Sequence, residues 1–230
     1  MKGLLFVPEM AVAVCEDRKT VTRRVITYPV PQIHPSPPCN PLYNVTMNEV
    51  LWKLGEKSPK AAERYCDYQP GERRCLLTTW AVGNVWDEHK PLDIPTYINS
   101  WHAGLGTPKP DWAGKSRPGR FLPNSARHLM PVFEIASVNA ERVQDITEED
   151  AIREGIEPIH DNSGLGWPCG WKDYQNPDSL PFDHAKPKAS FKSLWDSINA
   201  DRKDEEGKRL PYSWADNPWV WRVEFRRVKP

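Results

Sequence analysis

Proline is the residue that most constrains what this chain can fold into. The sequence has 24 prolines in 230 residues, and each fixes its own φ and lacks the backbone N–H that a helix interior or a central strand requires. The chain also has 11 tryptophans, large apolar side chains that each carry one polar N–H group. We therefore expect short regular elements joined by long loops that pack against them.

The prolines cluster in segments that we interpret as insertions. Three stretches, at about residues 27–70, 83–119 and 157–188, are rich in proline, glycine or aspartate and show neither helical nor strand periodicity through most of their length. The segments between them have regular patterns. We accordingly predict a single domain over residues 1–230, decorated by these three insertions.

The charge balance and the hydropathy limit the kinds of binding partner that we expect for this chain. Lysine plus arginine number 31, as do aspartate plus glutamate, so any nucleic-acid contact must come from a local patch and not from a global field. No stretch approaches the roughly 18 continuous apolar residues of a spanning helix, and no signal peptide is evident. We expect a cytoplasmic protein without a membrane partner.

The number and spacing of the cysteines predict that they form no disulfide bond. The five cysteines are odd in number and form no CxxC pair, which argues against a disulfide framework and against an ordinary zinc site. We predict free thiols, no metal and no cofactor. A metal site built from Cys66 or Cys75 with His89 or His102 is the alternative.

The first half of the chain shows one helical and two extended patterns. Residues 8–17 have an apolar stripe at helical spacing after Pro8, and a short helix is expected there. Residues 21–26 alternate as a strand does, and residues 74–82 have the β-branched, aromatic and apolar content of another strand.

The second half begins with an extended apolar run at residues 132–138, which predicts a core strand. A helix follows: Thr147 to Asp150 resembles a capping box, and Gly155 is expected to end the helix. A second helix is expected after a Ser190 cap. Its buried face comprises Phe191, Leu194, Trp195 and Ile198.

The final strand has the clearest alternation. Trp219, Trp221, Val223 and Phe225 are expected to form its core-facing side. Short helices among well-separated strands indicate an α+β barrel and not a parallel sheet.

The strongest functional candidate is the segment from Arg18 to Arg24, which has four cations and two hydroxyl groups in seven residues. Arginine, lysine and threonine are the usual donors to phosphate. We predict ligand contacts from Arg18, Thr20, Arg23 and Arg24. The alternative is an edge strand whose cations are solvated and prevent aggregation.

The same segment also suggests acid–base chemistry. Burial lowers the pKa of a lysine, and a neutral Lys19 would then deprotonate a threonine hydroxyl group. A carboxylate must handle the proton, and Glu154, beside Gly155, is the candidate; the alternative is an exposed helical acid.

In several ordered blocks, at residues 16–26, 70–72, 79–81, 142–151, 154–156, 191–199 and 217–225, the sequence resembles ASCH-domain proteins of the PUA-like superfamily, of the phage or prophage type. The first block, residues 16–26, is similar to the family's opening GRKTxTRR pattern. The blocks cover about half of the chain and leave the insertions between them. The remaining blocks are Pro70-Gly71-Glu72, Thr79-Trp80-Ala81, residues 142–151, Glu154-Gly155-Ile156, residues 191–199 and residues 217–225.

The resemblance implies a PUA-like (ASCH) mixed β-barrel with short flanking helices, long loop insertions and an RNA-binding-like cleft. One bacterial branch of the family hydrolyses the acetyl amide of N4-acetylcytidine, and the resemblance to that branch implies the same reaction as a candidate activity of this chain. By motif, Lys19 would be the base, Thr22 the nucleophile and Glu154 the proton-handling acid, with a backbone amide or an arginine as oxyanion donor. Leu77-Thr78 departs from the Arg-Glu pair common in phage relatives.

Two further residues are candidates for ligand contact. Trp80 is able to stack on a base or fill the core, and Arg127 is expected near the cleft. We predict RNA, DNA or a nucleoside-like small molecule as the partner, bound through a basic cleft. Hydrolysis of acylated nucleosides is the main alternative; ribonuclease activity and a phage accessory role with a protein partner are the others.

Overall fold

The computed structural model describes residues 1–26, 66–95, 98–106, 108–160, 168–176 and 185–228. Residues 27–65, most of the first expected insertion, lie outside the described residues. No helix in the described part of the chain is long and apolar enough to cross a membrane. Short helices and several strands make this an α+β protein, as the sequence predicts.

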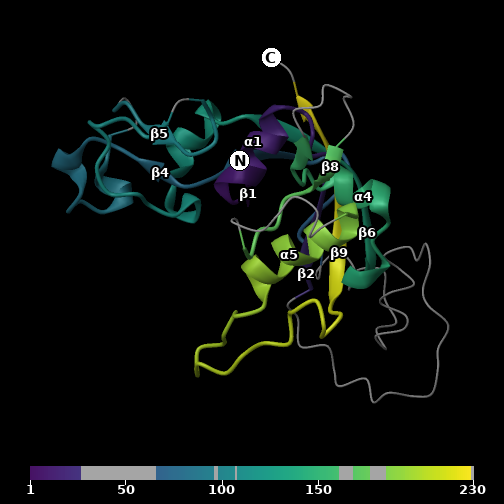
Figure 1. The fold of residues 1–230 in the computed structure, drawn as a ribbon. Helices are drawn as coiled ribbons and strands as arrows, with labels where there is room; N and C mark the ends of the chain where they lie inside the picture. The colour runs from purple at the N-terminus through teal and green to yellow at the C-terminus, as the bar shows by residue number, and fades with distance from the viewer. Residues whose placement is uncertain (27–65, 96–97, 107, 161–167, 177–184, 229–230) are drawn as a thin grey trace, which may run out of the picture. The chain divides into compact units, whose positions relative to one another are not determined.

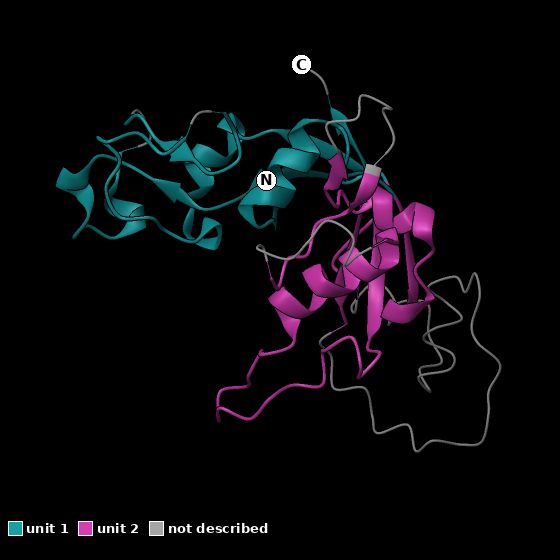
Figure 2. Ribbon diagram, viewed as in Figure 1, with its two compact units in different colours: residues 1–20, 71–136, 225–230 teal, residues 21–70, 137–224 magenta. Residues whose placement is uncertain are grey.

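The chain divides into two compact units, each built from separate stretches of sequence. Unit 1 comprises Met1–Thr20, Gly71–Ala136 and Phe225–Pro230, and unit 2 comprises Val21–Pro70 and Ser137–Glu224 (Figure 2). The second expected insertion belongs to unit 1 and the third to unit 2.

The strands form one five-stranded sheet and two small ones (Figure 1). The large sheet has the open order β1-β3-β6-β9-β2, and β4-β5 and β7-β8 are separate pairs. The described strands therefore do not close into the expected barrel, because the additional strand residues pair with each other and do not extend the large sheet. The strands are β1 (Gly3–Leu5), β2 (Val21–Val25), β3 (Arg73–Leu77), β4 (Trp80–Ala81), β5 (Trp101–His102), β6 (Val132–Arg142), β7 (Pro158–His160), β8 (Pro168–Trp171) and β9 (Trp219–Val228).

Unit 1 is built around aromatic side chains. In it β1 runs parallel to β3, and β3 is antiparallel to the start of β6. The rings of Phe6, Phe133 and Phe225 pack together with centroids 4.8 to 6.2 Å apart. The predicted first helix is confirmed as α1 (Pro8–Cys15), with Pro8 in its first turn, where the missing N–H costs nothing.

Unit 1 has a second buried cluster, to which the second insertion contributes Ile94. There β4 is antiparallel to β5, and short 3-10 turns surround the pair. The buried side chains are Cys75, Leu77, Trp80, Val82, Ile94, Leu122 and Met130.

In unit 2, β2 is antiparallel to β9, with Arg23 opposite Arg222. Both strands are predicted correctly, but the buried face of β9 differs in part from the expectation. Trp221 and Val223 are buried as expected, whereas Trp219 is only half-buried and Val220 is fully buried. Strand β9 is thus covered on both faces at Val220, which simple alternation does not anticipate.

The two α-helices described in the second half of the chain also lie in unit 2. Helix α4 (Glu148–Arg153) has the predicted cap, since the Thr147 hydroxyl group accepts a hydrogen bond from the Asp150 amide, and Gly155 follows with φ 83°. Helix α5 (Pro187–Asn199) begins at a Lys186 cap and not at Ser190, because Pro187 fits the first turn.

The burial of α5 follows the prediction except at one position. Phe191, Leu194 and Trp195 are buried, but Ile198 is exposed. Strands β7 and β8, which the sequence analysis assigned to an irregular insertion, pair through Ile159 and Gly170.

We predict that protonation of His102 destabilises the fold. Burial lowers the pKa of His102 from 6.5 to about 4. Its Nε2 lies 2.9 Å from the Ser100 hydroxyl group, while Nδ1 is buried without a partner among the described residues. Because the folded pKa lies below the unfolded one, the stability is fully present above about pH 6.5 and is lost as the pH falls toward about 4.

The measurement is urea unfolding at about pH 7 and about pH 4.5, where His102 should account for a loss of roughly 2 kcal/mol. His102→Gln, which has no titrating ring, should show a correspondingly smaller loss. Equal pH dependence in both proteins would contradict the prediction.

Candidate functional site

Arg23 is the centre of a buried ion-pair network in unit 2. Its side chain is 1% exposed. The guanidinium group donates from Nε to Glu141 at 2.6 Å, from Nη2 to Asp150 at 2.8 Å and from Nη1 to Glu154 at 3.1 Å. The arginine comes from β2, and the carboxylates come from β6, α4 and the residue that ends α4. Arg23 therefore joins three elements of unit 2 through one planar group.

Two more arginines complete the network. Arg222, opposite Arg23 on β9, donates to both oxygens of Asp150 at 2.6 and 2.9 Å. Glu224 accepts from Arg222 at 3.3 Å and also from Arg153. The Asp150 carboxylate thus receives hydrogen bonds from both β2 and β9, and it holds the N-terminal turn of α4 against these strands.

Within the network, the pKa values of two carboxyl groups are shifted in opposite directions. Burial opposes ionisation of Asp150, but hydrogen bonds from Arg222 and Arg23 outweigh it and hold the pKa of Asp150 well below its ordinary range. At Glu141 the burial effect is the larger one, and it raises the pKa despite the nearby Arg23. Two acids that contact one guanidinium group therefore differ in their tendency to take up a proton.

Of the three proposed catalytic residues, Glu154 lies beside Arg23, whereas the side chain of Thr22 points to the face of β2 opposite Arg23. Thr22 and Glu154 are almost fully buried and both belong to unit 2, where Thr22 precedes Arg23 on β2 and Glu154 is one of its partners. Lys19 is also almost fully buried but belongs to unit 1, where its ammonium group lies 5.9 Å from the centroid of the Phe6 ring.

The remaining residues of the basic segment differ in environment. Arg18 is exposed and pairs with Glu16 at 2.6 Å. Thr20 is half-buried, and its carbonyl accepts from the Phe225 amide. Arg24 is also half-buried, and burial lowers its pKa.

The last two candidates lie in unit 1. Trp80 is buried in the core cluster, and its indole N–H donates to the Pro118 carbonyl at 3.3 Å. Arg127 donates to the carbonyls of Leu122 and Met1. Thr78 is also buried in unit 1. It is one of the two residues that stand where the resembled family commonly has an Arg-Glu pair.

Sequence reasoning missed Glu141, Arg222 and Glu224 as network residues and considered Asp150 only as part of a cap. The one available signal was that Arg222 and Glu224 are the polar positions of an alternating strand. Nothing local connects them with Arg23.

Among the described residues, no group of three or more histidine, cysteine, aspartate and glutamate side chains is arranged to hold a metal ion. The cysteines described are Cys15, Cys66, Cys75 and Cys169, and all are free thiols. Comparison of the chain with protein-family models, with curated proteins and with solved structures finds no match.

We predict that Arg23→Met destabilises the protein by about 3 to 5 kcal/mol, because it leaves buried carboxylates without their shared cation. Urea unfolding checks this. The matched control is Arg226→Met, because the Arg226 side chain is 74% exposed and pairs with Glu134. The control should lose much less stability, because solvent screens an exposed ion pair. Similar losses in the two variants would show that the network contributes no more than a surface pair.

Proposed function

We propose that this protein binds a nucleic acid or a modified nucleoside and that it is an ASCH-type member of the PUA-like superfamily. The observation that carries the proposal is the buried hydrogen bond between Arg23 and Glu154 in unit 2. These residues come from two separate blocks of the family resemblance. A motif that resembles a ligand site in sequence is thus also a polar cluster in the folded unit.

Stability alone is a weak explanation for such a cluster. Removing charged groups from water is costly, and a buried ion pair often stabilises a fold no better than apolar side chains of similar size. Carboxyl groups with opposed pKa shifts, as at Asp150 and Glu141, are frequent at functional sites. We therefore assign Arg23 a positioning role, in which it orients Glu154 toward the ligand.

Phosphate contacts are assigned to Arg18 and Arg24. The pair between Arg18 and Glu16 is exposed, and such pairs contribute only about 0 to 1 kcal/mol, so a phosphate group is able to replace Glu16. With equal numbers of acidic and basic residues in the whole chain, the affinity must come from such local contacts.

Isothermal titration with cytidine, N4-acetylcytidine and a short single-stranded RNA tests the binding function. Glu154→Gln removes the charge that Arg23 orients, and we expect it to weaken binding by about tenfold or more. Glu149→Gln, an exposed acid of α4, is the matched control and should bind as the unmodified protein does. The proposal fails if none of the three ligands binds or if both variants bind equally well.

A second candidate function is hydrolysis of an acylated nucleoside. The observation that favours it is that Lys19, Thr22 and Glu154 are all nearly fully buried, although lysine and glutamate rarely are. The Thr22 hydroxyl group would attack the amide carbonyl, and the family resemblance assigns the role of base to Lys19. The proton removed from Thr22 would reach the departing amine through Glu154, and water would then hydrolyse the acyl-threonine to the free acid and regenerate the threonine hydroxyl group.

Chromatography of N4-acetylcytidine after incubation with the protein tests this reaction. We expect formation of cytidine and acetate, and a rate at least about 100-fold lower in Lys19→Ala and in Thr22→Val. Lys192→Ala, an exposed lysine of α5, is the control and should retain the rate. Binding without turnover in the unmodified protein would rule out hydrolysis of this substrate and leave the binding function.

A further inference from the structure

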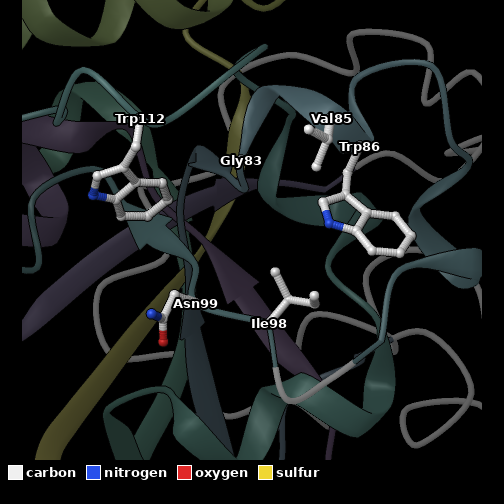
Figure 3. A pocket seen from close by; sticks show the side chains of 6 residues that line it. All are labelled: Gly83, Val85, Trp86, Ile98, Asn99 and Trp112. Atoms are coloured by element: carbon white, nitrogen blue, oxygen red, sulfur yellow. The ribbon is translucent and has the colours of Figure 1, made fainter.

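A pocket lies within unit 1, among residues that the sequence analysis treated as an insertion. Its volume is about 410 Å³. Figure 3 shows the indoles of Trp86 and Trp112 on opposite sides of the hollow, with Ile98 and Asn99 along a third side. The lining residues are Gly83, Val85, Trp86, Ile98, Asn99 and Trp112.

The polar groups of this pocket are available for a ligand. In the part of the chain that the structure describes, the indole N–H groups of Trp86 and Trp112 and the Asn99 amide have no hydrogen-bond partner in the protein. Trp112 is 48% exposed, an unusual position for so large an apolar side chain. The pocket therefore offers two aromatic surfaces together with hydrogen-bond donors and an acceptor.

Arg117 fixes the backbone of the segment that carries Trp86 through hydrogen bonds. The Arg117 guanidinium group is buried and donates to the carbonyls of Trp86 at 2.6 Å, Asp87 at 3.2 Å and His89 at 3.1 Å. The Asp87 carboxylate in turn accepts from the Lys115 amide at 2.6 Å. Because these hydrogen bonds already fix the backbone, this segment should lose little conformational entropy when a ligand binds.

The wall that carries Trp112 is held by a close backbone approach. The Gly114 amide donates to the Val82 carbonyl at 2.8 Å. A Cβ atom at Gly114 would lie 2.4 to 2.6 Å from atoms of Asp87 and Asn84, so only glycine fits there. Both tryptophans are consequently presented by segments whose backbone is already fixed.

We infer that this pocket binds a nucleobase, with adenine preferred. No charged side chain lines it, which matches an uncharged flat ring. Stacking of a base on an aromatic side chain is worth about 1 to 3 kcal/mol. An asparagine amide is able to pair with both N6 and N7 of adenine, which gives the Asn99 amide a specific role. The pocket lies within unit 1 and shares no residue with the Arg23 network, so the inference stands independently of the function proposed above.

Fluorescence and calorimetric titration with adenosine, uridine and hexa-adenylate test the inference on the full chain. We expect adenosine to bind, and Trp112→Ala to weaken its binding by roughly tenfold or more. Asn99→Ala should reduce the preference for adenosine over uridine. Both positions are exposed, so the fold is expected to survive, and circular dichroism verifies this.

Two controls separate this pocket from other sites. Phe121→Ala removes an aromatic side chain of similar exposure that does not line the pocket, and it should leave adenosine binding unchanged. Glu154→Gln should also leave it unchanged, since that change acts on the other site. Tighter binding of hexa-adenylate than of adenosine would identify a single strand as the source of the base, and equal binding would identify a free nucleoside.

The inference is overturned if neither adenosine nor hexa-adenylate binds, or if Trp112→Ala binds adenosine as well as the unmodified protein does. Binding of methyl glucoside or of tryptophan amide in place of adenosine would likewise overturn it, because a sugar or a peptide side chain would then be the occupant.

Discussion

The structure of unit 2 depends on the interaction of one guanidinium group with three carboxylates. Arg23 has donors in a fixed planar arrangement, and Glu141, Asp150 and Glu154 occupy them from β6, α4 and the end of α4. A lysine would supply the charge without this geometry. Because the group is shielded from water, each partner must remain in place, and the positions of β2, β6 and α4 within the unit are coupled.

The network shows that the basic residues between Arg18 and Arg24 have different environments. They are not equivalent donors to a phosphate group: Arg23 is internal and bound to carboxylates, whereas Arg18 is at the surface. Arg18 precedes β2, and within the strand the side chains of Thr22 and Arg24 point to the face opposite that of Arg23. Glu154 shares the burial of Arg23, which strengthens electrostatic interactions and excludes water.

The segment after β4 has a different character. It was expected to be an irregular insertion, yet it forms β5 and the tryptophan-lined pocket and contributes Ile94 to a buried cluster. Its backbone carbonyls are bound by the buried Arg117, a function that ladder hydrogen bonds perform in regular sheets. A proline-rich segment therefore reaches a defined structure through side-chain to backbone hydrogen bonds, which have no periodicity in sequence.

The sequence by itself determined the elements whose signals are local: α1 after Pro8, strands β2 and β9, and helix α4 between Thr147 and Gly155. Proline geometry, alternation and capping act over a few residues and can be recognised there. Only the tertiary structure decided the open strand order, the burial of Val220 and the partners of Arg23. Those partners lie 118 to 131 residues away along the chain. An ion pair depends on distance in space, and chain folding sets that distance without leaving a local pattern.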